Sequence, residues 1–294
     1  MRDVILFGAG ASYSSNDVIP YPPPLGGKYL YNDIKNCIFL INFLPKETKE
    51  VFYEDFEKGM DLYYEYTGGE IISIQRRLAF YFAKFKPGID NNFIKLINKI
   101  KNNYIICTLN YDLLIEESSW WCDYNYRYDL IKDSKFINVL KLHGSCNFWP
   151  DLQGFTISNA TFKKSGRADI QAKIKPLDRL ETIQQCVEQD SVAPAMAVYA
   201  KDKSVKISPD FVEWQQYMWS LALGYAKNVY IFGAGINLHD THIWQPIENT
   251  RANINYFGVT DSDKAKFNEW YKTINKNNLF FNYADFDSFL SIFN

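Results

Sequence analysis

Unbroken apolar runs that end in glycine or polar residues divide this chain into the strands of a buried sheet. The first run, residues 4–7, has no polar alternation, which is typical of a parallel strand covered on both faces. Runs at 104–108 and 138–142 predict two more strands of this kind. In the last third of the chain, apolar runs alternate with amphipathic segments. The strands expected there are 228–232, 254–259 and 279–283. We therefore predict an α/β fold with a doubly wound, mostly parallel, Rossmann-like sheet.

Helical spacing dominates the segment between the first two strands. Apolar positions recur there every three or four residues, which predicts helices that each bury one face. These positions are Ile71, Ile74, Leu78, Phe82 and Phe85, followed by Phe93, Ile94, Ile97 and Ile100. A further helix is expected from Lys28 to about Phe39, with a face formed by Leu30, Ile34 and Cys37 or Ile38. We interpret residues from about 40 to 102 as a helical insertion within one domain that spans residues 1–294.

The pattern is looser after the third strand. Residues 146–192 are interpreted as an irregular small subdomain, with a possible helix at 177–189 and another strand at 193–199. The aromatic segment 120–131 predicts an edge strand or a hairpin. A long helix is expected over residues 209–226. The stripe predicted to be buried consists of Phe211, Trp214 or Gln215, Met218, Leu221 and Tyr225.

Two glycine loops follow the first and fourth strands. Residues 8–12 read Gly-Ala-Gly-Ala-Ser, and residues 233–237 read Gly-Ala-Gly-Ile-Asn. Amides in such loops point at an anion, so two loops on one sheet favour a dinucleotide held across a crevice. Alternatively, each glycine serves a tight turn without any ligand. The third glycine of a dehydrogenase fingerprint would fall at Tyr13, and no acidic strand end follows about 20 residues later, which disfavours hydride transfer.

Polar side chains follow the second and third strands where each strand ends. Asn110 and Asp112 come after the run at 104–108, and His143 follows the next strand. The carboxyl ends of parallel strands face the ligand crevice of such a sheet, so all three are candidate site residues. A histidine in this position suits acid/base chemistry. Alternatively, Asp112 caps the short helix expected at 113–117.

Composition disfavours several classes of function. The net charge of −2 provides no basic field, so no direct contact with nucleic acid is expected. The five cysteines include no Cys-x-x-Cys pair, which argues against a zinc ribbon and a disulfide framework. No apolar run reaches the ~18 residues of a membrane span, and the first residues do not resemble a signal peptide. We expect a cytoplasmic protein without zinc.

Two further features invite a functional interpretation. His239 and His242 flank Asp240 at a spacing that suits a metal, but no third distant ligand is evident. We therefore expect no metal site and interpret Asp240 as a helix cap. Trp120 and Trp121 offer a contact surface, but we expect both to be buried in the core.

Three motifs in order carry a resemblance to a known family. They are the Gly-Ala-Gly-Ala-Ser loop, Thr-Leu-Asn-Tyr-Asp at 108–112 and Lys-Leu-His-Gly at 141–144. This combination resembles the sirtuin superfamily, in which corresponding motifs build the NAD site. The chain is also similar to a sirtuin-like branch of bacterial antiphage defence proteins, which share Leu-His-Gly-Ser, here 142–145, and a late Gly-x-Gly-x-Asn loop. The resemblance extends from Val4 to at least the strand at 257–259.

The resemblance implies a role for each matching residue. The phosphates are contacted by the first loop, through Gly8, Ala9, Gly10 and Ser12. Asp112 holds the nicotinamide carboxamide, and Asn110 orients the ribose or the attacking water. His143 acts as general base on a ribose hydroxyl. The adenosine side is held by Gly233, Gly235 and Asn237, with Asp261 as a further ribose ligand. Bond cleavage between nicotinamide and ribose develops positive charge on the sugar, which preorganised dipoles and a proton acceptor stabilise.

Departures from the family narrow the expected activity. Only Cys146 and Cys186 lie beyond the His-Gly pair, too few for the four zinc ligands of sirtuin deacylases. The segment that pairs with an acyl-lysine peptide has no clear match near 197–199. We therefore expect an NAD+ glycohydrolase that depletes NAD in antiphage defence. The alternatives are a non-catalytic module that binds NAD or ADP-ribose and, ranked last, an NAD-dependent protein deacylase.

The resemblance to this family also implies that the NADase activity is regulated. An unregulated NADase is toxic, so the resting chain is expected to be inactive. Activation would come from a partner protein, such as a sensor ATPase or nuclease, or from assembly into a homo-oligomer.

Overall fold

A parallel sheet forms the centre of the molecule. The computed structural model describes residues 2–21, 28–36, 38–154, 160–162, 168–188, 191–197, 205–274 and 276–293. Within these residues, the main sheet has seven strands in the order β13-β12-β11-β1-β4-β6-β5, and every pairing is parallel. The strands are β1 (Asp3–Phe7), β4 (Tyr104–Thr108), β5 (Asn125–Arg127), β6 (Phe136–Lys141), β11 (Asn228–Phe232), β12 (Asn253–Gly258) and β13 (Leu279–Tyr283).

The strand order confirms the doubly wound prediction. From β1 the chain moves outward through β4 to the edge strand β5 and turns back to β6 between them. It then crosses to the other side of β1 at β11 and moves outward through β12 to β13. The direction of winding therefore reverses between β1 and β11. In sheets of this kind, ligands bind beyond the carboxyl ends of the strands at such a switch point.

Both faces of the sheet are covered by helices, which explains the unbroken apolar runs. In β1, Val4 and Leu6 join one core cluster while Ile5 and Phe7 join the other, and all four are fully buried. The first cluster includes side chains from α9 (Pro209–Tyr225), α10 (Thr241–Asn249) and α11 (Asp261–Thr273). The second includes side chains from α6 (Asn92–Ile100), α7 (Leu114–Trp121) and α12 (Phe286–Leu290). Successive residues of a strand thus serve opposite faces.

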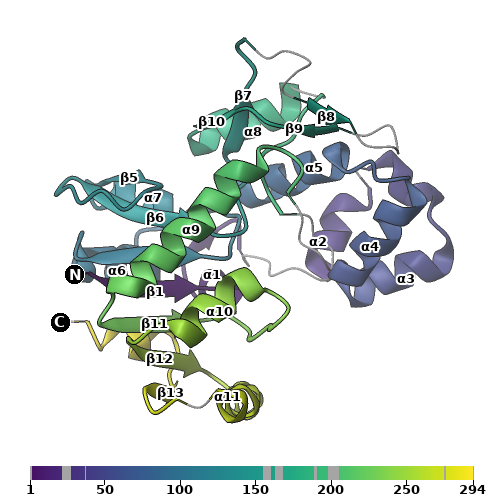
Figure 1. The fold of residues 1–294 in the computed structure, drawn as a ribbon. Coiled ribbons are helices and arrows are strands. Elements are labelled where there is room, and N and C mark those ends of the chain that lie inside the picture. The colour runs from purple at the N-terminus through teal and green to yellow at the C-terminus, as the bar shows by residue number, and fades with distance from the viewer. Residues whose placement is uncertain are drawn as a thin grey trace.

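The predicted helical segment forms a lobe beyond the carboxyl ends of the strands (Figure 1). It contains α2 (Lys28–Ile34), the 3₁₀ helix η1 (Phe39–Phe43), α3 (Lys46–Glu54), α4 (Phe56–Tyr66) and α5 (Ile72–Ala83). All nine apolar positions predicted from 71 to 100 are buried, as are Leu30, Ile34 and Ile38. Cys37 lies outside the described residues. The last predicted helix, α6, packs on the sheet side against α7 and α12.

A small unit follows β6, where the sequence predicts irregular structure. β7 (Phe148–Asp151) pairs antiparallel with β10 (Lys173–Pro176), and β8 (Ala160–Phe162) pairs with β9 (Ala168–Ile170). The predicted helix is confirmed as α8 (Arg179–Glu188), which packs against α5. The predicted strand at 193–199 is wrong for residues 193–197, which form only isolated bridges, and residues 198–199 lie outside the described part. Another short pair, β2 (Val18–Ile19) with β3 (Lys86–Pro87), was not predicted.

One prediction of burial is wrong and another is wrong in part, since Gln215 of α9 is buried as one alternative predicted whereas Trp214 and Tyr225 are exposed. The helix α7 runs four residues beyond its predicted end at 117, and its last residues Trp120 and Trp121 are 71% and 50% exposed. The buried residues of α7 lie between Leu114 and Ser119, so the two tryptophans that follow lie beyond the part of the helix that packs in the core. In α9 the buried positions are Val212, Gln215, Trp219, Ala222 and Leu223. Aromatic residues occur on several sides of α9 itself, so the hydrophobic pattern alone did not predict which side of the helix faces the sheet.

No helix among the described residues combines the length and apolar character that crossing a bilayer requires.

Candidate functional site

The residues of the three sequence motifs lie past the carboxyl ends of three adjacent strands, β1, β4 and β6. In the register of β4 and β6, Thr108 is paired with Lys141. Asn110 and His143 each follow their paired residue by two positions. On the other side of β4, Phe7 at the end of β1 is paired with Thr108. The loops that carry the three sequence motifs therefore begin side by side at one edge of the sheet (Figure 1).

A buried chain of hydrogen bonds joins the first two motifs. The Asn110 Nδ2 group donates to Gly8 O at 2.9 Å and to Ser12 Oγ at 2.8 Å. Ser12 Oγ in turn donates to Asp112 Oδ2 at 2.7 Å. Asn110 and Asp112 are each 8% exposed, and Ser12 is 7% exposed. The structure thus brings together three residues that were predicted from two motifs about 100 positions apart, and each fixes the rotamer of the next.

Asp112 makes the contact at the start of α7 that the capping alternative predicts, and its role as a site residue stays a prediction. Its Oδ1 accepts a hydrogen bond from the backbone nitrogen of Leu114 at 3.1 Å, at the start of α7. Its Oδ2 accepts the Ser12 hydroxyl described above. The helix contact therefore orients the carboxylate toward α1 (Ala9–Tyr13), the short helix of the first loop.

His143 lies in the loop after β6 and is 5% exposed. Its backbone oxygen accepts a hydrogen bond from Ala197 N at 2.8 Å, which ties this loop to the chain beyond α8. The following Gly144 has a φ of +80°, and a Cβ there would lie 2.1 Å from the backbone oxygen of Ala195. Only glycine is suited to this conformation and close approach, which explains the His-Gly pair without reference to a ligand.

The glycines of the two loops pack against each other. The Gly8 nitrogen donates to the last carbonyl of β11 at 3.1 Å, and the Gly10 nitrogen donates to Gly233 O at 2.9 Å. A Cβ on Gly8 would lie 2.4 Å from Ala234 Cα. Gly233 has a φ of +67°, which disfavours a side chain there. Close approach of β1 and β11 therefore requires these glycines, and phosphate contacts by residues 8–12 stay a prediction.

The second glycine loop, residues 233–237, follows β11 on the other side of the switch point and is more exposed than the first three motifs. Gly235 is exposed, and a Cβ added to it would meet nothing within 4 Å. Asn237 holds its own turn, since its Oδ1 accepts from His239 N at 3.2 Å. Asp240 stands at the N-cap position of α10 as predicted, but its side chain makes no capping hydrogen bond to the helix. Asp261 begins α11, one strand further from β1.

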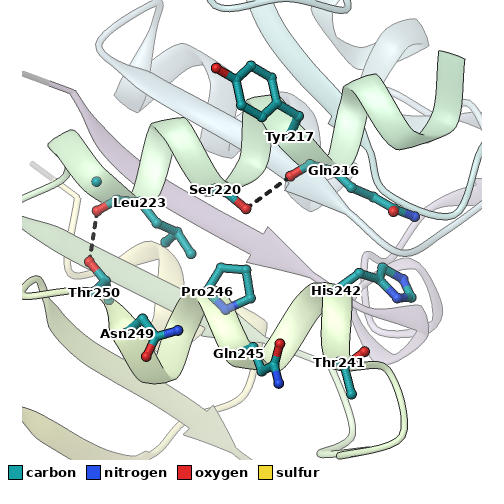
Figure 2. Close-up of a pocket in the computed structure, with 11 residues that line it drawn as sticks. Gln216, Tyr217, Ser220, Leu223, Thr241, His242, Gln245, Pro246, Asn249 and Thr250 are labelled. Carbon is teal, nitrogen blue, oxygen red and sulfur yellow. Dashed lines mark hydrogen bonds between the residues drawn. The ribbon is translucent and has the colours of Figure 1, made fainter. Parts of the chain in front are cut away.

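A groove of about 530 Å³ runs between α9 and α10, on the side of the sheet that these helices cover (Figure 2). Most of the residues that line it carry uncharged polar groups, among them Gln216, Ser220, Gln245, Asn249 and Thr250. His242 lines one end, and its ring centroid is 5.2 Å from that of His143. In addition, Gln216 Nε2 donates to Leu142 O at 3.0 Å, next to His143. The groove therefore adjoins the loop that carries the candidate base.

Comparisons with known proteins found similarity among solved structures. No family model matches the chain, and no curated protein sequence matches it. The chain is similar to a mutant Sir2 homologue in complex with ADP-ribose, with 13% identity, a TM-score of 0.43, and coverage of 99% of this chain and 89% of that one. It is similar to a Sir2 homologue in complex with NAD, with 14% identity, a TM-score of 0.43, and coverage of 99% and 87%. A Sir2 mutant with a p53 peptide and NAD matches with 14% identity, a TM-score of 0.44, and coverage of 99% and 91%.

The strand order and register of this chain themselves define its doubly wound parallel sheet. Among the residues that the structure describes, no group of three or more histidine, cysteine, aspartate or glutamate side chains is arranged to hold a metal. His242 instead lies edge to face against His143.

Sequence reasoning missed a buried ion pair behind the candidate loop. Lys141 Nζ lies 3.2 Å from Glu116 Oε1, and the two side chains are 1% and 2% exposed. Burial raises the pKa of the Glu116 carboxyl above its usual value, while the Lys141 ammonium acts in the opposite direction. The available signal was a charged residue within the apolar run 138–142, because a buried lysine requires a partner.

Proposed function

We propose that this chain hydrolyses NAD+ at the bond between nicotinamide and ribose, giving nicotinamide and ADP-ribose. The observation that carries this proposal is the buried chain from Gly8 through Asn110 and Ser12 to Asp112, with His143 following the adjacent strand end in register. Acceptors and a candidate base are thus fixed at the edge of the sheet before a substrate arrives. Preorganised polar groups of this kind stabilise charge that develops during a reaction.

The residues have distinct parts in the proposed reaction. The bond between the ribose carbon and nicotinamide breaks, its electron pair goes to the nicotinamide nitrogen, and a water oxygen bonds to the carbon. Because both amide hydrogens of Asn110 are already donated, its Oδ1 is the atom that orients this water. His143 accepts a proton from a ribose hydroxyl. The Asp112 carboxylate receives the carboxamide of nicotinamide. The attacking water gives one proton to the ribose oxygen that His143 deprotonated, and His143 releases its proton to solvent as ADP-ribose forms.

The binding roles of the remaining residues complete the proposal. We assign the phosphates to the loop of Gly8, Ala9, Gly10 and Ser12, and the adenosine side to Gly233, Gly235, Asn237 and Asp261. The exposed Gly235, with open space around it, supports close approach of a nucleotide to this backbone.

The biological role that fits the motif resemblance is depletion of NAD as the effector of a bacterial antiphage defence system, in the cytoplasm. An enzyme of this kind must be silent at rest. We therefore propose that a partner protein, such as a sensor ATPase or nuclease, or assembly into a homo-oligomer activates it.

Nicotinamide release from NAD tests the proposal. The full chain is assayed over a range of concentrations that spans self-association, beside Asn110→Ala and His143→Ala. We expect release by the wild type under at least one assembly condition and a decrease of about 100-fold or more in each variant. Equal release by all three chains contradicts the assignment of these residues.

The alternative is a module that binds NAD or ADP-ribose without cleaving it. The mutual hydrogen bonding of Ser12, Asn110 and Asp112 favours it, since a fully satisfied network also suits a rigid binding site. Calorimetric titration with ADP-ribose separates the two proposals. Binding without nicotinamide release in every condition favours the module, whereas NAD-dependent deacetylation of a lysine peptide would instead support a deacylase.

A further inference from the structure

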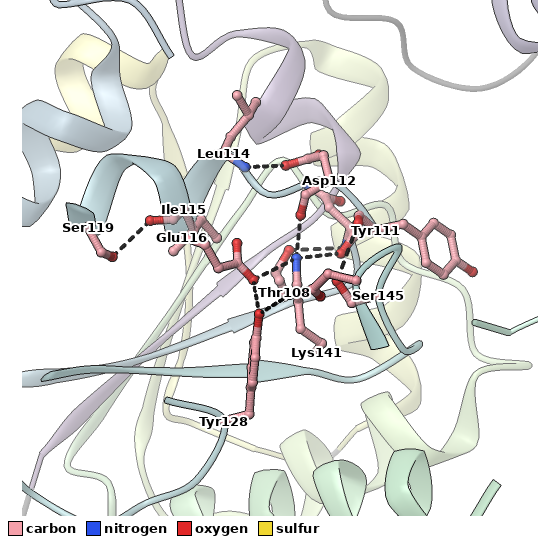
Figure 3. A network of polar contacts seen from close by, with 12 residues as sticks. Thr108, Tyr111, Asp112, Leu114, Ile115, Glu116, Ser119, Tyr128, Lys141 and Ser145 are labelled. Carbon is pink, nitrogen blue, oxygen red and sulfur yellow. Dashed lines mark hydrogen bonds and ion pairs between the residues drawn. The ribbon is translucent and has the colours of Figure 1, made fainter. Parts of the chain in front are cut away.

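A lysine ammonium is buried against the loop that carries Asn110 and Asp112. Lys141 is the last residue of β6, and its side chain is 1% exposed. Its Nζ donates to Asn110 O at 3.3 Å, donates to Asp112 O, and pairs with Glu116 Oε1 at 3.2 Å (Figure 3). An ammonium has three N–H groups. These three acceptors therefore account for all of them.

The carboxylate that pairs with Lys141 has a second partner. Glu116 lies in the first turn of α7 and is 1% exposed as a residue. Its Oε1 also accepts the Tyr128 hydroxyl at 3.1 Å, and that hydroxyl accepts Asn147 Nδ2 at 2.9 Å. The ion pair is thus part of a buried network that joins β6, α7 and the segment before β7. Its members come from separate parts of the chain, so the network ties these elements to one another.

Stability alone does not explain this arrangement. A buried ion pair contributes little compared with apolar residues of similar volume, because both charges lose their hydration. Two of the three acceptors of Lys141 are backbone carbonyls of the residues whose side chains form the candidate site. Each carbonyl lies in the plane of a peptide unit, so the ammonium fixes the direction of the backbone at Asn110 and Asp112.

We propose that Lys141, neutralised by Glu116, is a positioning residue that holds the backbone at Asn110 and Asp112 in the orientation needed for cleavage. This inference rests on the proposed hydrolysis of NAD+. Glu116 has a second role in this proposal, which is to neutralise the ammonium, because positive charge develops on the ribose as nicotinamide leaves. An ammonium without its carboxylate would oppose that charge.

Paired substitutions separate positioning from stability. Lys141→Met alone leaves the Glu116 carboxylate buried without its counterion, and we expect a large drop in melting temperature. The double variant Lys141→Met/Glu116→Gln removes both charges and keeps an acceptor for Tyr128, so we expect its melting temperature to return toward that of the wild type. Lys46→Met is the matched control, because it removes an ion pair whose side chains are 86% and 63% exposed.

Two readouts decide the role of Lys141 in the double variant. If the ammonium positions the loop, kcat for nicotinamide release falls about 100-fold while KM for NAD stays within about threefold. Amide hydrogen exchange across residues 109–113 becomes about tenfold faster or more, without a matching change in the central strands. The control variant keeps wild-type exchange and kinetics.

A folded double variant with wild-type exchange at residues 109–113 and wild-type kcat overturns the inference. Recovery of melting temperature and kcat together also overturns it, because that result assigns the pair a structural role only. A wild-type chain that never releases nicotinamide refutes the proposed hydrolysis. The exchange measurement still decides whether Lys141 orders the loop, so the two failures are distinguishable.

Discussion

The two halves of the carboxyl edge of the sheet hold their polar residues in different ways. Beyond β1 and β4, the side chains of Asn110 and Asp112 are buried and bonded to Ser12 in α1, about 100 positions away in the sequence. Beyond β11 and β12, Asn237 bonds within its own turn, and the exposed Asp261 accepts the Tyr283 hydroxyl at 2.7 Å. Buried hydrogen bonds fix geometry before binding, whereas side chains nearer the surface stay accessible to a ligand. We infer that the first half serves chemistry and the second half serves binding.

The largest expected effect comes from the same substitution in each half. Asp112→Asn replaces a carboxylate oxygen that accepts the Ser12 hydroxyl, and we expect kcat for nicotinamide release to fall about 100-fold or more. Asp261→Asn is expected to raise KM by up to about tenfold and to leave kcat within about threefold. Steady-state kinetics check both. A larger loss of kcat in Asp261→Asn than in Asp112→Asn would break the comparison.

A second matched pair tests the packing of the two glycine loops. Gly8→Ala places a Cβ 2.4 Å from Ala234 Cα, and we expect a loss of about 1–3 kcal/mol in the free energy of unfolding. Gly235→Ala meets nothing within 4 Å and is expected to change stability by less than about 0.5 kcal/mol, while ADP-ribose binding weakens. Urea unfolding and calorimetric titration measure the two quantities. Equal loss of stability in both variants would contradict the close approach of β1 and β11.

The smallest expected effect is a pH dependence that belongs to the first half alone. Burial raises the pKa of Glu116 above its usual value, so in the window above about 4.3 the folded chain binds more protons than the unfolded chain. The contribution of this group to stability therefore falls as pH rises through that window, by at most about 1.4 kcal/mol per pH unit. The reference is Lys141→Met/Glu116→Gln, which lacks both charges. Unfolding in urea from pH 4 to 7 should show the wild type losing stability relative to it, and a relative gain would refute the direction.

The local sequence pattern predicted the main strands of the sheet but did not predict which residues of two helices are buried. The apolar runs correspond to β1, β4, β6, β11, β12 and β13, because strands covered by helices on both faces are mostly apolar, although β6 also buries Asn138 and Lys141. Trp120 and Trp121 were wrongly expected in the core, since exposure at the end of α7 depends on which turn meets the sheet. In α9, Tyr225 is 68% exposed although it was expected on the buried stripe. Aromatic residues on every side of a helix hide its orientation.

The site was predictable as far as its residues come from strand ends. Asn110, Asp112 and Ser12 were all named from motifs, and the structure joins them directly. The Lys141–Glu116 pair was missed because its members are 25 positions apart, on a strand and a helix, and no spacing rule connects them. Tertiary contacts of this kind become visible only when the elements are placed in space.

The central claim is that Asn110 and His143 act on one ribose carbon. A crystal structure of the chain with ADP-ribose tests it most directly. The account predicts the ribose that carried nicotinamide between the Asn110 side chain and the His143 ring, with the adenosine beyond β11 near Gly235. A ribose bound elsewhere, or one whose reactive carbon faces away from both side chains, would contradict it.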